Sequence, residues 1–482
     1  MIALAAGRYA RSCFTSLVGA CGRTHSNNQM TPKNAVALCL ADSFLAGSLD
    51  AESILARGLH AIGVDHAKQA PWLARLVGKI KLRYGRSLKI TSRVVLAHWI
   101  ANSTSFGNTW APAAKSVSIR HYFLDSPEMR PRPAVLSRHR LPKLATCGDL
   151  ARWLGVPIAQ LDWFTGAIAK SRQPAAGPLA HYHYQWLIKR SGACRLLEIP
   201  KSRLREMQRR ILRLILDRIP AHPAAHGFVR GRSCATHVVP HIGQRVVVRI
   251  DLKNFFPSIP ASRVHALFAT LGYPDPVARA LTGLCTHQMP GAALRAFPLP
   301  ENAQKLTWTE RKQYQIPHLP QGAPTSPALA NLCAYRLDVR LAAAAAAAGA
   351  NYTRYADDLV FSGPENFARA ALRFHILVCR IALEEGFEVN TRKTRVMLQS
   401  VQQKVTGIVM NQRPNIPRVD FDRLKATLNN CVKHGPQSQN IAQHANFKAH
   451  LKGKIAYVQM LNAERAYKLR LLFDQILWFA ET

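Results

Sequence analysis

The chain has 482 residues, of which 48% are apolar, and 65 Lys and Arg against 27 Asp and Glu give it a formal net charge of +38. These values indicate a globular protein of two or three domains whose positive field attracts polyanions, with nucleic acid as the first candidate partner and a membrane surface as the alternative. No run of about 20 strongly apolar residues is present to cross a bilayer, and the ten Cys, at long and irregular spacings, argue against a zinc site or a disulfide framework.

The N-terminal part of the chain carries no catalytic pattern. Residues 1–29 contain Arg, Ser and Thr but no acid, and we predict an unstructured leader there. We predict that residues 30–140 form a helical extension and a linker, because apolar residues recur at helical spacing and Pro and Arg crowd Ser126–Pro142. Two roles stay open for the extension, namely packing and RNA binding.

A hairpin and a basic helix are predicted next. Two β-prone runs of His181–Ile199 flank Arg190-Ser191-Gly192, and Lys189 and Arg195 lie on or beside this hairpin. In Lys201–Ile219, apolar residues at spacings of three and four predict a helix. Its other side carries Arg203, Arg205, Arg209, Arg210 and Arg213. We expect this side to contact the backbone of a template or of another RNA, and the alternative is a solvated face.

A glycine-containing run, His226–Ser233, follows the helix. Gly227 and Gly231 allow the backbone to approach a ligand closely. We therefore expect Arg230 and Arg232 to reach phosphate groups.

Three carboxylates are the candidate catalytic groups. Asp251 ends the strand-like run Arg245–Ile250. Asp357 and Asp358 lie between the two β-prone halves of Tyr352–Gly363, which predicts a hairpin with both acids in its turn. Only folding brings Asp251 close to this pair, because the positions are far apart in the sequence.

Three carboxylates that folding brings together predict a metal site. Adjacent anions repel, and a divalent cation between them relieves the repulsion. Carboxylate oxygens suit Mg²⁺. Two such ions about 3.5–4 Å apart clamp the attacking and leaving oxygens of a phosphoryl transfer. A solvated acidic turn is the plainer alternative for the Asp pair alone.

Four motifs carry a family resemblance. They are Asp251 with Phe255-Phe256-Pro257-Ser258-Ile259, the loop Leu319-Pro320-Gln321-Gly322-Ala323-Pro324-Thr325-Ser326-Pro327, Tyr355-Ala356-Asp357-Asp358, and Val405-Thr406-Gly407. The first three resemble the motifs of reverse transcriptases. The Ala-Pro-Thr-Ser-Pro form of the loop and the Val-Thr-Gly element are most similar to bacterial retron reverse transcriptases. The resemblance covers Leu141–Trp478 and leaves out the N-terminal extension.

The resemblance implies an α+β fold, the right hand of polymerases. Residues 141–400 would form the fingers and an antiparallel palm sheet, and residues 401–482 a helical thumb, next to the helical N-terminal extension. The implied activity is RNA-directed DNA polymerisation in the bacterial cytoplasm, without a membrane. In retrons the cognate structured noncoding RNA is copied into msDNA, a branched RNA–DNA. Defence against phage with an effector protein of the same operon is also implied.

The resemblance also assigns roles to residues. Two Mg²⁺ ions, or Mn²⁺ as a substitute, would be held by Asp251, Asp357 and Asp358. Deoxynucleotides would be bound by Lys189, Arg195, Phe256, Gln321, Gly322 and Lys393. In this set Phe256 would exclude a 2′-hydroxyl, and Lys393 would lie near the departing pyrophosphate. The cognate RNA would be bound by Arg230, Arg232, Val405, Thr406 and Gly407, and the cDNA product would stay with the enzyme.

Two rival functions remain. A group II intron-type or other bacterial reverse transcriptase is one, although intron enzymes usually carry a second Gly where this chain has Ala323. The other is an RNA-binding protein without polymerisation, against which the intact carboxylates argue.

Overall fold

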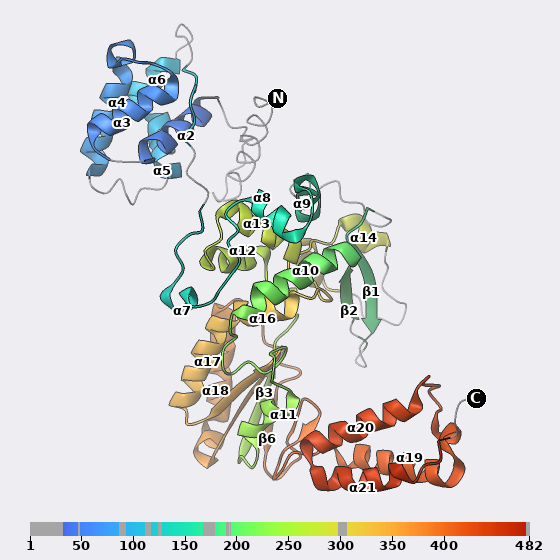
Figure 1. The fold of residues 1–482 in the computed structure, drawn as a ribbon. Helices are drawn as coiled ribbons and strands as arrows, with labels where there is room; N and C mark the ends of the chain where they lie inside the picture. The colour runs from blue at the N-terminus through green and yellow to red at the C-terminus, as the bar shows by residue number, and fades with distance from the viewer. Residues whose placement is uncertain are drawn as a thin grey trace. The chain divides into compact units, whose positions relative to one another are not determined.

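The computed structural model describes residues 32–46, 49–85, 93–110, 117–123, 128–166, 179–188, 192, 194–296 and 306–478. The predicted leader, residues 1–29, and Lys189 lie outside these ranges. The chain divides into two compact units, Met1–Ser126 and Pro127–Thr482 (Figure 1).

The first unit is helical. Its α-helices are α2 (Pro32–Leu45), α3 (Ala51–Ile62), α4 (Pro71–Tyr84), α5 (Arg93–Asn102) and α6 (Thr104–Gly107). Helix α3 begins after Asp50, whose side chain accepts a hydrogen bond from the Ser53 amide at 2.7 Å, and it ends at Gly63, which has a φ of 69°. The helices enclose one apolar cluster that includes Leu40, Ile54, Leu73, Ile80 and Ile100. This unit therefore has a core of its own.

The second unit is built on a four-stranded antiparallel sheet. Its strands are, in spatial order, β4 (Asn351–Tyr355), β5 (Asp358–Gly363), β3 (Val246–Asp251) and β6 (Arg395–Leu398). Strand β5 is buried along its whole length, and β3 is almost entirely buried. The register sets Asp251, at the end of β3, opposite Asp358, at the start of β5.

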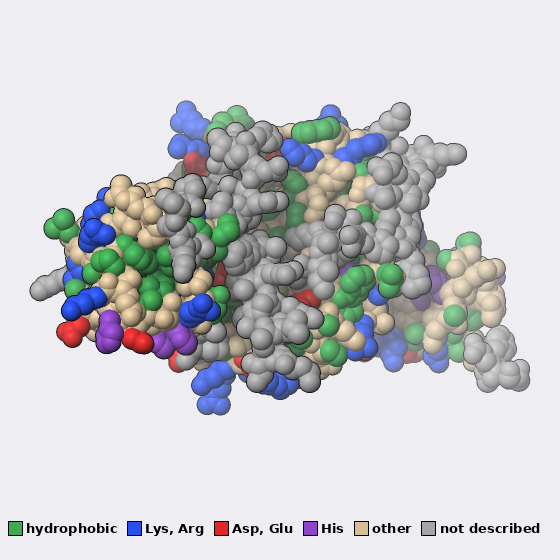
Figure 2. All heavy atoms as spheres, turned by 90° about the horizontal axis from the view of Figure 1, so that it is seen from above, with side chains coloured by type: hydrophobic (Ala, Val, Ile, Leu, Met, Phe, Trp, Pro, Cys, Tyr) green, Lys and Arg blue, Asp and Glu red, His purple; other side chains and the backbone are tan. Residues whose placement is uncertain are grey.

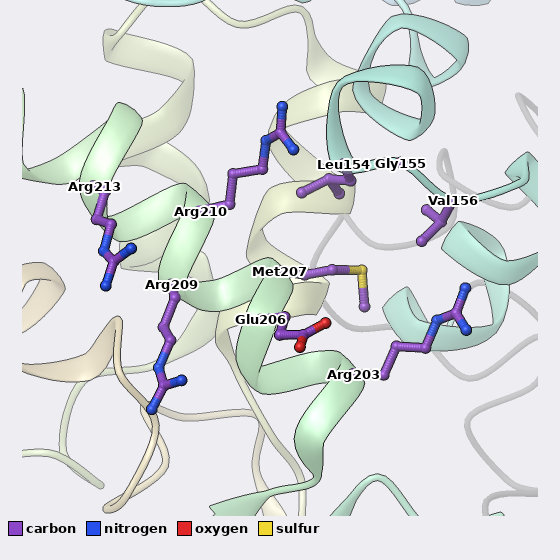
Figure 3. Close-up of a pocket in the computed structure, with 9 residues that line it drawn as sticks. All are labelled: Leu154, Gly155, Val156, Arg203, Glu206, Met207, Arg209, Arg210 and Arg213. Carbon is purple, nitrogen blue, oxygen red and sulfur yellow. The ribbon is translucent and has the colours of Figure 1, made fainter.

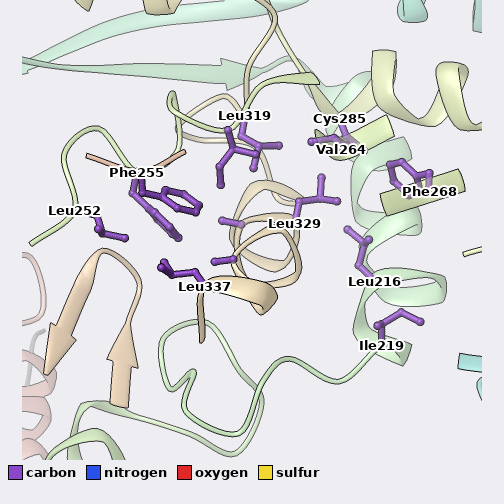
Figure 4. Packing of buried hydrophobic residues seen from close by; sticks show 14 of the residues in the cluster. Leu216, Ile219, Leu252, Phe255, Val264, Phe268, Cys285, Leu319, Leu329 and Leu337 are labelled. Atoms are coloured by element: carbon purple, nitrogen blue, oxygen red, sulfur yellow. The ribbon is translucent and has the colours of Figure 1, made fainter. Parts of the chain in front are cut away.

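The two faces of this sheet pack against different layers, because successive strand side chains point to opposite sides. Val248, Ile250 and Phe361 join the main apolar cluster, part of which is shown in Figure 4. The helices that contribute to this cluster include α16 (Ser326–Cys333), α17 (Tyr335–Ala347) and α18 (Glu365–Glu384). Val247 and Val360 point the other way and join the cluster of the C-terminal helices.

A second small sheet pairs β1 (Tyr182–Ile188) with β2 (Cys194–Pro200) in antiparallel register. The helix predicted over Lys201–Ile219 ends earlier, because α10 spans Ser202–Leu214 and a 3₁₀ turn, η5 (Leu216–Arg218), follows it. The other α-helices of this region are α7 (Ala134–Ser137), α8 (Cys147–Leu154), α9 (Ile158–Thr165), α11 (Cys234–Val238), α12 (Ala261–Thr270), α13 (Asp275–Cys285), α14 (Gly291–Ala296) and α15 (Trp308–Gln315).

The C-terminal part consists of a short hairpin and three helices. The hairpin pairs β7 (Lys404–Val405) with β8 (Ile408–Val409). The helices α19 (Arg418–His434), α20 (Phe447–Leu461) and α21 (Ala463–Asp474) pack side by side around Leu428, Leu451, Ile455 and Leu469 (Figure 1).

The surface agrees with the composition. In the view of Figure 2, Lys and Arg side chains are spread over the described surface, and Asp and Glu side chains are few. Among the described helices, none combines the length and the apolar character that crossing a bilayer requires. Cys285 and Cys431 are buried free thiols.

Candidate active site

The three candidate carboxylates come together at one end of the four-stranded sheet. Asp251 and Asp358 face each other across β3 and β5, and Asp357 lies in the turn between β4 and β5. The prediction that both acids of the pair lie in the turn is wrong for Asp358. The turn is Ala356–Asp357, because Tyr355 already pairs with Asp358 in the β4–β5 ladder.

The turn is strained, and a glycine lies directly against it. Ala356 has a φ of 56°, in the left-handed region that is unfavourable by roughly 1–2 kcal/mol for a residue with a Cβ. A Cβ at Gly227 would stand 2.6 Å from the Ala356 nitrogen. Just before this contact in both segments, the His226 amide donates to the Arg354 carbonyl and the Arg354 amide to the Ala224 carbonyl, both at 2.7 Å. Gly227 is thus required by this backbone contact, whereas the sequence analysis expected it to approach a ligand.

A buried ion pair supports the same turn. Arg354 and Asp338 are both 0% exposed, and the guanidinium donates to both carboxylate oxygens, at 2.8 and 2.6 Å. It also donates to Asn331 Oδ1 at 2.9 Å and to the Ala356 carbonyl at 3.1 Å, and Asn331 Nδ2 donates to the Gly227 carbonyl at 2.9 Å. The sequence analysis missed these three polar residues. A charged residue on the apolar face of α17 was the available signal for Asp338.

Two cations accompany the carboxylates. Lys393 Nζ lies 2.9 and 3.0 Å from the two oxygens of Asp251. Arg249 donates from Nε and Nη2 to the two oxygens of Asp358, at 2.8 and 2.7 Å. Within the described part of the chain, no cation is paired with Asp357 in this way. Lys393 was predicted at the site but Arg249 was not, although residues two apart in a strand share a face and Arg249 precedes Asp251 by two.

The carboxylates fit a hard divalent cation in their chemistry. Burial raises the pKa of Asp357, and the charges of Asp251 and Asp358 raise it further. Burial also raises the pKa of Asp358, against the opposing effect of Arg249. A bound cation relieves such repulsion, and carboxylate oxygens are suitable ligands. In the described ranges, no three Asp, Glu, His or Cys side chains lie close enough together to form a preformed metal site.

Aromatic side chains border the carboxylates. The Phe256 ring is half-buried and lies 6.1 Å from the ring of Phe228, which in turn lies 6.4 Å from the ring of Tyr355. Phe255, in contrast, is buried in the main cluster. The sequence analysis missed Phe228, which is 51% exposed and has a φ of 62°. The selection of the sugar by Phe256 stays a prediction.

The Gln321–Gly322 loop rests on strand β2. The Glu198 amide donates to the Gln321 carbonyl at 2.8 Å, and a Cβ at Gly322 would stand 2.8 Å from the Glu198 carbonyl oxygen. The Glu198 carboxylate is 0% exposed and pairs with His318 Nε2 at 2.9 Å. The loop is therefore joined to the same strand that carries Arg195.

The predicted phosphate-binding cations differ in their surroundings. Arg195 is exposed on β2, and Arg230 is exposed on the glycine-containing loop. Arg232 donates instead to the Ala225 carbonyl at 2.9 Å, so it holds the loop together in this structure, whereas we had expected it to reach outwards. Lys189 lies outside the described residues.

The Val405–Gly407 turn borders a cavity. Thr406 and Gly407 have φ values of 47° and 87°, as a two-residue hairpin turn of type I′ requires. Val405 is buried, and the Thr406 hydroxyl is buried without a hydrogen-bond partner in the described part of the chain. Gly407 lines a cavity of about 750 Å³ between α19 and α20. The cations on its walls are Arg423 and Lys454, and His450 lies beside them.

The chain is similar in sequence to known proteins. Residues 187–410 match the family described as "Reverse transcriptase (RNA-dependent DNA polymerase)". The chain is 38% identical to the retron Mx65 reverse transcriptase of Myxococcus xanthus, across 81% of this chain and 87% of that one. It is 34% identical to the retron Mx162 reverse transcriptase of the same organism, across 66% of this chain and 64% of the relative. It is 32% identical to the retron Ec86 reverse transcriptase of Escherichia coli, across 48% and 62% respectively.

Proposed function

The chain belongs to the reverse transcriptases, which are RNA-directed DNA polymerases, and within them to the retron enzymes, and on this premise we propose that it copies one structured noncoding RNA into msDNA, a branched RNA–DNA. The observation that carries the chemistry is the facing pair Asp251 and Asp358 with Asp357 in the adjoining turn. The proposed reaction joins the 3′-hydroxyl of a primer to the α-phosphate of a deoxynucleotide and releases pyrophosphate.

The three carboxylates are proposed to hold the metal ions. Reverse transcriptases generally use divalent ions, and we assign Mg²⁺ here, with Mn²⁺ as a substitute. Two such ions at Asp251, Asp357 and Asp358 would stabilise the charge that develops on the attacking and leaving oxygens.

The remaining site residues bind and orient the substrates in this proposal. Lys393, beside Asp251, supplies positive charge or a proton to the departing pyrophosphate. Phe256 packs under the sugar and excludes ribonucleotides. The incoming triphosphate and the template are bound by Lys189, Arg195, Gln321 and Gly322.

Each part of the second unit takes a role in the same proposal. The β1–β2 hairpin serves as the fingers, the four-stranded sheet as the palm, and the helices α19–α21 as the thumb. Recognition of the cognate RNA is assigned to Arg230, Val405, Thr406 and Gly407. The adjacent cavity supports this assignment, because its walls carry Arg423 and Lys454 against one acid, Asp420, and such a groove suits an RNA strand at the Val405–Gly407 turn.

The cellular setting is also a proposal. We place the enzyme in the bacterial cytoplasm, with its noncoding RNA, its cDNA product and an effector protein of the same operon as partners. Its biological role in this proposal is defence against phage. The retron relatives support this setting, because they associate the chain with a retron.

Substitution of the acidic pair tests the catalytic assignment. Asp357→Asn and Asp358→Asn should each lower DNA synthesis on a primed RNA template by a factor on the order of 100 or more, because charge stabilisation in the transition state is lost. RNA binding, measured on the same samples, should stay unchanged. Asp474→Asn is the matched control, since Asp474 is exposed at the end of α21 and the substitution removes the same charge. Near-normal extension by either site variant in Mg²⁺ would overturn the assignment.

A further inference from the structure

An arginine-rich cavity lies on α10, and it shares no lining residue with the candidate active site. The cavity has a volume of about 450 Å³. Its walls are the Leu154–Val156 turn after α8 and the outward side of α10 (Figure 3). The residues contributed by α10 are Arg203, Glu206, Met207, Arg209, Arg210 and Arg213. In Figure 3, Arg203 and Arg213 mark the two ends of this surface, with Met207 and Glu206 between them.

The four arginines outnumber the acids of the cavity lining, in which Glu206 is the carboxylate. All four are exposed, and in the described part of the chain none forms an ion pair with Asp or Glu. Arg203 donates to the side-chain oxygen of Gln160 at 3.0 Å, and the Arg210 guanidinium lies 5.2 Å from the centre of the Trp153 ring. Four positive charges on one helix face repel one another, so a bound polyanion would stabilise this surface.

The cavity also has an apolar floor. Leu154 and Met207 are buried at its base, 8% and 3% exposed. A concave site of a few hundred Å³ with apolar lining and a few polar groups suits a small planar group such as a nucleobase. Arginine planes and aromatic rings are the surfaces on which unpaired bases stack in RNA complexes. Arg210, whose guanidinium lies over the Trp153 ring, also lines this cavity.

We propose that this cavity binds an unpaired nucleotide of an RNA strand, with its base over Met207 and beside Arg210, and the flanking phosphates on Arg203, Arg209 and Arg213. RNA is the occupant that fits, because the chain is an RNA-directed polymerase and the template is the polyanion that it must hold. The inference rests on this family membership and not on the msDNA or defence proposals.

A charge-matched pair of double variants tests the phosphate contacts. Arg209→Gln with Arg213→Gln removes two charges from the cavity. Arg369→Gln with Arg373→Gln removes two charges from the exposed side of α18 and is the control. Binding of poly(U) RNA is measured over a range of salt concentrations without nucleotides, so the result does not depend on catalysis. The cavity variant should lower the slope of log affinity against log salt by about 1.4, since each single-strand phosphate contact contributes about 0.7. The control should leave the slope unchanged.

A second variant tests the base. Arg210→Lys keeps the charge but removes the planar guanidinium, so poly(U) binding should weaken while the salt slope stays constant. Unchanged affinity of this variant would overturn the nucleobase contact. Equal salt slopes for the two double variants would overturn the proposal, as would a loss of affinity by the cavity variant that is as large on duplex RNA as on poly(U). A loss of affinity confined to a poly-glutamate probe would also overturn it, in favour of an acidic protein segment.

Discussion

At the scale of single residues, the two aspartates that face each other have different cationic partners. Asp358 is 8% exposed, and both of its carboxylate oxygens accept hydrogen bonds from Arg249, whose side chain is 33% exposed. Asp251 is paired with Lys393, whose side chain is 51% exposed and therefore better able to move away when substrates arrive. The Arg249–Asp358 pair is thus the more rigid of the two ion pairs, and we expect Arg249 to stay in place where Lys393 moves.

Replacing Arg249 should lower the stability of the protein, because Asp358 is left as a buried carboxylate without its cation. Arg249→Met should destabilise the protein by about 1–3 kcal/mol in a metal-free buffer, because a buried carboxylate loses its hydrogen-bond partner. Mn²⁺ should restore more stability to this variant than to the unsubstituted protein, since the ion takes over the neutralisation of Asp358. Chemical denaturation with chelator and with Mn²⁺ measures both effects.

The same strand offers a control for this experiment. Arg245 pairs with Glu365 at the other end of β3, where both side chains are 52% exposed. Arg245→Met should change stability by about 1 kcal/mol or less, as exposed ion pairs do, and should show no Mn²⁺ effect. Equal losses of stability in the two variants would show that the Arg249–Asp358 pair contributes no more than an exposed ion pair.

At the scale of elements, the proposed role of the β7–β8 turn in RNA selection can be tested separately from general nucleic-acid binding. Among the described residues, none lies within 4 Å of a Cβ built at Gly407, so a substitution there meets space but keeps an unfavourable φ of 87°. We predict that Thr406→Ala and, more strongly, Gly407→Val weaken binding of the cognate RNA at about 0.2 M salt, where nonspecific phosphate binding is suppressed. Extension on an artificial primer–template should survive. Binding titrations with cognate and scrambled RNA measure the difference.

A second glycine serves as the control for backbone strain. Gly435, at the end of α19, has a φ of 77° and equally open surroundings. Gly435→Val should lose similar stability without losing selection between the two RNAs. If Gly407→Val weakens cognate and scrambled RNA equally, the Val405–Gly407 turn has no part in recognition.

The elements around the carboxylates were predictable to different degrees. The strands were visible, because β-prone runs precede Asp251 and flank the acidic pair. The exact turn was not, because the choice of Ala356–Asp357 depends on Gly227 and on the buried Arg354–Asp338 pair, which are contacts between distant segments. The inward direction of Arg232 was missed for the same reason, since its partner is a backbone carbonyl that no side-chain pattern reports.

At the scale of the whole molecule, the two units have separate apolar cores. The core of the first unit is formed by residues between 37 and 106, and the largest core of the second begins after residue 129. A chain of residues 127–482 should therefore fold and extend a primer on an RNA template without the first unit. Scanning calorimetry should show one unfolding transition for this piece and an additional one for the full chain. Failure of residues 127–482 to fold would show that the first unit is needed for the stability of the second.

The support beneath the catalytic turn has a consequence for the movement of substrates. Ala356 is held by backbone contact with Gly227 and by the Arg354 guanidinium, which is anchored on helix α17 through Asp338. A carboxylate mounted in this way keeps its position from one nucleotide addition to the next. The growing RNA–DNA duplex must then translocate by one base pair per step past a stationary reaction centre. In the proposed mechanism the turn is therefore the fixed reference point of the copying cycle, and the thermal motion that advances the template belongs to the nucleic acid and to the segments that bind it.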